Sequence, residues 1–287
     1  NPYRGCLHGC RYCYARPTHE YLGLNAGLDF ETTIFVKNTA ATLLAKWLNS
    51  PSYQPQQVMM SGVTDCYQPI ERSLKITRSV LEVAQEALQP IAIITKNKLI
   101  TRDMDILSDM AEKKLCHVAF SINSLDQSLS RILEPRCSAP ASRLAAVKQL
   151  TEAGIPVHVV VAPIIPGLND HEMPAVLEQV AAAGATSASY ILLRLPFGVK
   201  DIFTDWLQTQ RPGSEEVVMS RLQATRDGQL NNSEFGKRMS GTGQIAEQIR
   251  HFFKVAARKN GLLQKPTPLR TDLFVPPTSA DGQMRLF

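Results

Sequence analysis

The sequence predicts an α/β fold built on a parallel sheet. Short apolar runs alternate with helical stretches from about residue 57 to residue 195, and their unbroken β-branched character is typical of strands buried on both faces. Together with a strand expected before the first cysteines, these runs give six β/α units, two fewer than a complete barrel needs. The periodicity fits either a partial barrel or a doubly wound open sheet. In both folds the functional side chains lie at the carboxyl ends of the strands.

The expected elements follow one another along the chain. A short strand at 34–37 precedes a helix at 39–48, and the further strands lie at 57–63, 91–95, 117–122, 157–164 and 187–195. The helices between them lie at 71–88, 102–114, 138–153 and 172–183. Glycine or proline ends several of these helices, as helix stops do.

The pattern changes after residue 198, which divides the chain into three parts. The α/β part takes 1–198, and 199–265 predicts a helical extension with an amphipathic helix at 243–260 whose apolar stripe packs on the sheet. Residues 266–287 are rich in proline, serine and threonine and predict an extended tail. No run of about 18 apolar residues is present, so a membrane span is not expected.

Three of the six cysteines lie close together near the start of the chain. Cys6, Cys10 and Cys13 have the spacing C-x3-C-x2-C, and such thiolates can ligate three irons of a [4Fe–4S] cluster, which normally takes four. No fourth cysteine follows in the motif, so one iron would be open to a small molecule, as in reactive metal sites. The alternatives are a zinc site completed by His8 or His19, and three unrelated buried cysteines.

The longer string around these cysteines resembles a known family. Tyr12 and Tyr14 flank the third cysteine, as in radical S-adenosylmethionine (SAM) enzymes of the branch that contains spore photoproduct lyase and relatives of unknown substrate. The resemblance covers residues 1–200 and implies a partial (β/α)6 barrel of the TIM type. It also implies that SAM chelates the open iron and that reduction cleaves SAM to methionine and a 5′-deoxyadenosyl radical. Tyr12 and Tyr14 are then expected to line the SAM pocket.

Polar residues at the strand ends are the further candidates for binding SAM. Thr64 and Asp65 follow the strand at 57–63, Lys96 ends the next strand, and Ser121 and Asn123 end the one after it. The resemblance implies that the Thr-Asp pair contacts SAM and that the lysine neutralises its carboxylate. From the residues alone, Asp65 could equally cap a helix, Lys96 could be a solvated surface residue, and Ser121 and Asn123 could satisfy turn backbone.

The sequence departs from the lyase at one position. The lyase has a hydrogen-donating cysteine three positions before the Asp, where this chain has Gly62. Cys66 is the catalytic candidate to replace that cysteine, although a side chain directly after Asp65 would point elsewhere. The departure leaves the exact reaction open. Further along, Glu134 and Arg136 could form an ion pair near the site.

Positive charge is concentrated in the C-terminal part of the chain. The net charge is +5, and residues 194–265 hold 12 Lys/Arg against 7 Asp/Glu, a surplus of 5 that equals the net charge of the whole chain. Within this part, Phe235 to Gly243 (FGKRMSGTG) mixes glycines with two cations before a helix, a pattern that suits a phosphate. A phosphate-bearing partner is therefore favoured.

The last five residues, Gln283 to Phe287, resemble the peptide with which bacterial replication and repair proteins bind the DNA sliding clamp. Leu286 and Phe287 would be exposed apolar area on a polar tail unless a pocket receives them. The alternative is that the tail folds back onto its own barrel.

These observations lead to one main hypothesis and two alternatives. The main hypothesis is a cytoplasmic, lyase-like radical SAM enzyme that takes electrons from a flavodoxin or ferredoxin and acts on a modified or damaged nucleotide in DNA, as in DNA repair. One alternative is radical modification of RNA or protein. The other is a DNA-associated protein whose iron–sulfur cluster is structural or redox-sensing.

Overall fold

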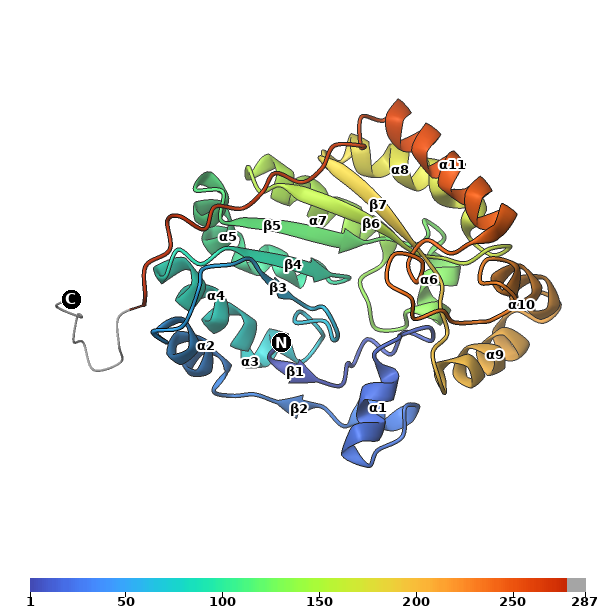
Figure 1. Cartoon of the computed structure of the whole chain (residues 1–287), viewed down its shortest axis with the longest axis horizontal. Coiled ribbons are helices and arrows are strands. Elements are labelled where there is room, and N and C mark those ends of the chain that lie inside the picture. Colours follow the sequence, from blue (N-terminus) through green and yellow to red (C-terminus); the bar gives the residue numbers. More distant parts are fainter. Residues whose placement is uncertain (278–287) are drawn as a thin grey trace.

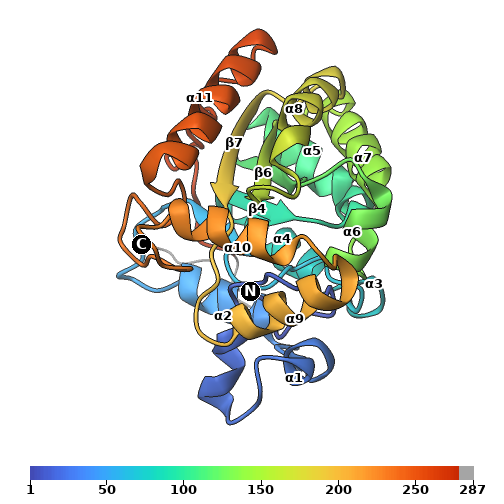
Figure 2. The ribbon, with the colours of Figure 1, turned by 90° about the vertical axis from the view of Figure 1, so that its right-hand side faces the viewer.

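The computed structural model describes residues 1–277. At the centre of this part lies a five-stranded parallel sheet in the order β3-β4-β5-β6-β7, with helices along its outer face (Figure 1). The strands are β3 (Val58–Met60), β4 (Ile91–Thr95), β5 (Cys116–Ser121), β6 (Val157–Ile164) and β7 (Ser187–Leu192). The strands change direction steadily from β4 to β7 (Figure 2), as right-handed sheet twist requires. This is the partial barrel predicted from the sequence.

Helices connect the successive parallel strands, and each packs one of its faces against the sheet. They are α3 (Glu71–Leu74), α4 (Ile76–Glu86), α5 (Met104–Glu112), α6 (Gln127–Leu133), α7 (Pro140–Glu152) and α8 (Met173–Ala182). The single helix expected at 71–88 is divided at Lys75, whose φ of 53° is left-handed and breaks the helix. The short helix α6 was not predicted, because its seven residues give little periodicity.

The first β/α unit differs from the others. β1 (Tyr3–Arg4) pairs antiparallel with β2 (Phe35–Val36), and the chain between them carries the cysteines, the 3-10 helix Arg16–Leu22 and α1 (Leu28–Thr32). Thr64, which follows β3, joins β1 to the sheet by donating its hydroxyl to the carbonyl of Tyr3 at 2.7 Å. A side chain therefore holds β1 beside β3 where a backbone ladder was expected. Helix α2 (Ala40–Leu48) follows β2.

The helical extension covers the β7 side of the barrel. It comprises α9 (Val199–Gln210), α10 (Glu215–Ala224) and α11 (Gly243–Lys259). Ile249, Phe253 and Ala257 of α11 are buried in the main core, and the Phe253 ring lies 4.9 Å from that of Tyr190 in β7. Most of the apolar stripe of this helix packs on the barrel, as predicted, but Phe252, which was also expected to pack there, is 61% exposed.

Residues 262–277, here called the C-terminal strap, run back along the amino ends of the strands (Figure 1). Backbone hydrogen bonds tie the strap to the residues before β5 and β4, from Arg270 N to the Lys114 carbonyl and from Val275 N to the Ala87 carbonyl, each at 3.0 Å. Residues 266–277 therefore fold back onto the barrel. The clamp-like peptide Gln283–Phe287 lies outside the described residues. Among residues 1–277, no helix has the length and apolar character to cross a bilayer.

Candidate active site

A cavity of about 290 Å³ lies at the carboxyl ends of the strands, beneath the cysteine loop. The loop, the strand ends and residues 191–194 after β7 all contribute to its wall. Eight of the predicted site residues line the cavity: Cys6, Cys10, Tyr12, Cys13, Tyr14, Asp65, Lys96 and Ser121. Parallel strands thus bring together side chains that are far apart in the sequence.

Arginine side chains hold the cysteine loop in its shape. Arg16 is fully buried and donates to the carbonyl of Cys10 at 3.0 Å, while its far end pairs with Glu31 at 2.5 Å. Arg136 pairs with the other oxygen of Glu31, also at 2.5 Å. Gly9 lies between them with φ 65°, and a Cβ there would approach both Arg136 and Glu31 to within 2.6 Å. Glycine is therefore required for the loop to close over this ion cluster.

The three thiols of the loop differ in acidity. Burial raises the pKa values of Cys6 and Cys13. A hydrogen bond with Cys137, whose Sγ lies 3.7 Å from the Sγ of Cys10, lowers the pKa of Cys10. Coordinated iron would deprotonate all three.

The donor set fits an iron–sulfur cluster. Three soft sulfur ligands line one cavity, and the Lys96 ammonium, which lines the same cavity, supplies positive charge to balance their thiolate forms. Burial alone would lower the pKa of Lys96, but the Cys10 thiolate and Glu134 outweigh burial and raise it. Within residues 1–277, no three His, Cys, Asp or Glu side chains surround a single ion position. A four-iron cube instead holds its thiolates at separate corners.

Both histidines of the zinc alternative are engaged elsewhere. His8 Nδ1 lies 3.5 Å from the Asp65 carboxylate, and its Nε2 lies 3.3 Å from the Asn97 amide. His19 Nε2 bonds to the Thr33 carbonyl at 3.0 Å, and His19 does not line the cavity. His8 would have to give up its contacts to complete a zinc site, and His19, although its Nδ1 has no hydrogen-bond partner, does not line the cavity that the cysteines share.

A buried charge network supports the cavity from below. Tyr12 donates its phenol hydrogen to Glu134, and the other Glu134 oxygen pairs with the buried Arg143. Burial alone would raise the pKa of Glu134, but Arg143 and Lys96 hold it below its usual range. The ion pair expected between Glu134 and Arg136 is wrong, because these side chains point to Arg143 and Glu31, respectively.

Asp65 connects three parts of the site. Its carboxylate accepts the backbone N–H groups of Tyr67 at 2.9 Å and Lys96 at 2.8 Å, and the Thr95 hydroxyl at 2.8 Å. With His8 at 3.5 Å, the same carboxylate spans the cysteine loop, the β3 loop and the end of β4. Asp65 is thus both a lining residue and a link between these segments.

Three predicted residues lie outside the cavity wall. Thr64 is buried and its hydroxyl is used by the Tyr3 carbonyl. Asn123 is buried with both side-chain polar atoms unpartnered, so a bound molecule reaching it would find a free amide. Cys66 packs in the main hydrophobic core, where burial raises its pKa, and its position gives no support to a role as hydrogen donor.

Sequence reasoning missed Arg194, whose guanidinium carbon lies 4.7 Å from the centre of the Tyr14 ring at the cavity mouth. Its position just after β7 is the same signal that singled out Lys96. Met239 also lines the cavity, and its carbonyl accepts the N–H of Leu192 at 2.9 Å. No local pattern indicates that Met239, in the loop before α11, reaches this wall.

Comparison with known proteins gives concordant results. Residues 1–180 match the family described as the Radical SAM superfamily. An uncharacterised protein of Mycobacterium tuberculosis is 37% identical over 214 residues, which cover 74% of this chain and 63% of the relative. An uncharacterised protein of Methanocaldococcus jannaschii is 32% identical over 172 residues, covering 60% and 62%. The chain thus spans less than two thirds of the length of either relative.

The fold is similar to that of spore photoproduct lyase. The structure of that enzyme complexed with dinucleoside spore photoproduct has a TM-score of 0.64 at 18% identity, covering 91% of this chain and 74% of the lyase chain. A double variant of the lyase with bound AdoMet and dinucleoside spore photoproduct has a TM-score of 0.61 over the same shares. At this level of identity the likeness concerns the fold.

Proposed function

The chain belongs to the radical SAM superfamily, and we propose that it binds a [4Fe–4S] cluster and SAM in the cavity and acts on a nucleic-acid substrate. The observation that carries the proposal is that Cys6, Cys10, Cys13 and Lys96 line one cavity at the strand ends. When bound, the cluster supplies the single electron that cleaves SAM to methionine and a hydrogen-abstracting 5′-deoxyadenosyl radical.

The residues of the cavity have separate roles in this proposal. Lys96 is a compact cation suited to the SAM carboxylate. Ser121 borders the cavity at the end of β5, and because its hydroxyl donates to the Ala162 carbonyl at 2.9 Å, it can serve SAM as an acceptor. Tyr12, fixed by Glu134, and Tyr14 offer ring faces to the adenine and methionyl groups. Asn123 has an unpartnered amide for the ribose or carboxylate. Thr64 and Asp65 hold the surrounding segments, and Asp65 also borders the cavity.

Aliphatic side chains are proposed to exclude water from the reaction. Ile94, Val160 and Ile191, from three different strands, line the cavity between the polar groups. An apolar wall keeps solvent from reactive intermediates and strengthens the electrostatic interactions inside. The protein thereby contributes orientation and shielding while the cofactor carries the chemistry.

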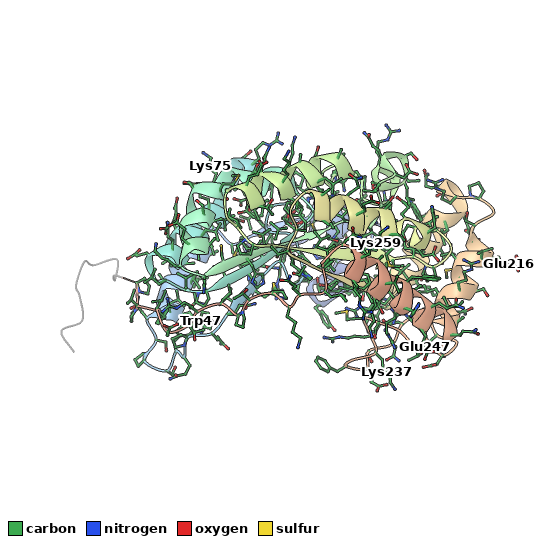
Figure 3. All side chains as sticks on the ribbon, turned by 90° about the horizontal axis from the view of Figure 1, so that it is seen from above. Trp47, Lys75, Glu216, Lys237, Glu247 and Lys259 are labelled. Carbon is green, nitrogen blue, oxygen red and sulfur yellow. The ribbon has the colours of Figure 1, made fainter. Side chains whose placement is uncertain are left out.

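A nucleic-acid substrate is supported by the mouth of the cavity. The exposed Phe235 ring has the guanidinium of Arg238 5.5 Å from its centre, and Arg194 stacks on Tyr14 nearby. Burial lowers the pKa of Arg194, and the charge of the neighbouring Arg238 lowers it further. Lys237 projects away from the fold on this side (Figure 3). Aromatic faces beside cations suit stacked bases and their phosphates.

For the reaction and the partners, we propose chemical classes and not individual molecules. Gly62 lines the cavity where the lyase has a cysteine, so we propose a lyase-like hydrogen abstraction and not the lyase reaction itself. A damaged or modified nucleotide in DNA is the proposed substrate, with RNA or protein as the alternatives. We also propose that the enzyme is cytoplasmic and takes electrons from a flavodoxin or ferredoxin. Docking of Gln283–Phe287 on a sliding clamp is part of the same proposal.

The proposed function is tested by an activity assay under anaerobic conditions. The protein is reconstituted with iron and sulfide, reduced with dithionite and given SAM with DNA or RNA oligonucleotides, and 5′-deoxyadenosine is quantified by chromatography. We expect product from the parent and from Cys116→Ala, a buried cysteine outside the cavity, but none from Cys13→Ala. A cluster-loaded parent that forms no product and shows no SAM-induced change in its electron paramagnetic resonance (EPR) spectrum would favour the structural or redox-sensing alternative.

A further inference from the structure

Cys137 is a thiol for which the proposed reaction has no use, yet it touches the site. It lies in the turn after α6, where its N–H donates to the Glu134 carbonyl at 3.1 Å. Two backbone hydrogen bonds tie this turn to the cysteine loop, from Arg136 N to the His8 carbonyl at 3.3 Å and from Arg11 N to the Leu133 carbonyl at 3.0 Å. The position of Cys137 is therefore fixed relative to the loop.

The contact between the two thiols is a hydrogen bond and not a covalent bond. The Sγ atoms of Cys10 and Cys137 are 3.7 Å apart, far beyond the roughly 2.05 Å of a disulfide. Cys10 lines the cavity, whereas Cys137 does not and packs instead beside the hydrophobic cluster that contains Cys10 and Tyr12. Cys10 is thus the one of the pair that faces the cavity and would ligate the cluster, and Cys137 lies outside the cavity wall.

We propose that Cys137 is a positioning residue that donates an S–H···S hydrogen bond to Cys10 and raises the reduction potential of the cluster. The inference rests on the proposed function, because it requires a cluster ligated by Cys10. A thiolate that holds iron has no proton to donate, so Cys137 is the donor. Hydrogen bonds to the ligating sulfurs help to set the potential of such clusters. A donor favours the reduced state because that state carries one more negative charge.

The test is a redox titration of the reconstituted protein without SAM, followed by EPR. Cys137→Ala removes the donor, and we expect its midpoint potential to be more negative than that of the parent. The expected change is about tenfold in the ratio of reduced to oxidised cluster at a fixed potential, or about 59 mV for one electron. Cys137→Ser keeps a hydroxyl donor and should lie closer to the parent. Cys116→Ala is the matched control, because its thiol donates to the Leu107 carbonyl outside the cavity.

The outcomes separate this inference from the proposed function. A cluster-loaded Cys137→Ala protein with the potential of the parent would overturn the role of Cys137 alone. A parent that takes up no cluster, measured by iron content and visible absorption, would overturn both. Loss of the cluster from both Cys137 variants, but not from Cys116→Ala, would identify Cys137 as an iron ligand and would also overturn the donor role.

Discussion

The carboxylate of Asp65 accepts the backbone N–H of Lys96 at 2.8 Å, which fixes the end of β4 to the loop after β3. The same carboxylate is only 10% exposed and also receives the Thr95 hydroxyl. Lys96 therefore enters the cavity from a backbone that a second segment holds in place. Asp65 influences the site through Lys96 as well as by bordering the cavity.

Asp65→Asn is expected to destabilise the protein by about 1–3 kcal/mol. An amide offers one acceptor oxygen where the carboxylate offers two, so its NH2 group would face a buried N–H donor such as that of Lys96 or Tyr67. Chemical denaturation of the cluster-free protein measures the change. Asp205→Asn, at an exposed position of α9, serves as the control. Equal stabilities of Asp65→Asn and the parent would show that the carboxylate does not hold the two segments together.

Lys96→Met is expected to weaken SAM binding to the reconstituted protein by about tenfold to a hundredfold. The variant keeps much of the side-chain length but removes a cation proposed to meet the SAM carboxylate, and hydrogen bonds to charged groups contribute about 1.5–3 kcal/mol. Equilibrium dialysis with labelled SAM measures the effect. Lys98→Met, two residues further along at the surface, should bind SAM as the parent does. Unchanged affinity in Lys96→Met would exclude the proposed contact.

The sequence predicts the part of the site that regular structure determines. The carboxyl ends of parallel strands converge, so Lys96 and Ser121 could be expected to meet the cysteine loop. Strand β3 ends at Met60, and beyond it the pleat no longer sets the direction of side chains. Whether Thr64, Asp65 or Cys66 faced the cavity therefore depended on the loop conformation, and only Asp65 does.

Long-range pairs are the part that the sequence could not supply. Cys10 and Cys137 are 127 residues apart, and Tyr12 and Glu134 are 122 apart. No periodic pattern connects such positions, because the contacts depend on how the turn after α6 packs against the loop. The sequence expectation paired Glu134 with the nearest cation, whereas burial selects Arg143.

Substitution of Lys237 and Arg238, two cations in the segment before α11, is expected to reduce the salt dependence of nucleic-acid binding. A Lys237→Gln, Arg238→Gln double variant removes two proposed phosphate contacts, so the slope of log K against log salt for a single-stranded oligonucleotide should fall by about 1.4. Fluorescence anisotropy measures the slope. Lys75→Gln alters a lysine far from Lys237 in Figure 3 and should leave the slope unchanged. An unaltered slope in the double variant would remove this surface from the proposed substrate path.

The histidine at the start of β6 is expected to make stability depend on pH. Burial, aided by the nearby His117, lowers the pKa of His158 to about 4, while serine hydroxyls lie 2.8 Å and 2.7 Å from its two ring nitrogens. In the unfolded chain the imidazole takes up a proton near pH 6.5, so between pH 6.5 and 4 the unfolded state binds more protons than the folded state. The free energy of unfolding should therefore fall as pH is lowered through this range, by at most about 3 kcal/mol from this residue.

Urea titrations of the cluster-free protein at several pH values test this dependence. The free energy of unfolding should decline less steeply in His158→Gln than in the parent or in His251→Gln, a change at an exposed position of α11. If the His158→Gln and parent profiles run parallel, the imidazole titrates alike in the folded and unfolded chain and this account of the pH dependence is wrong.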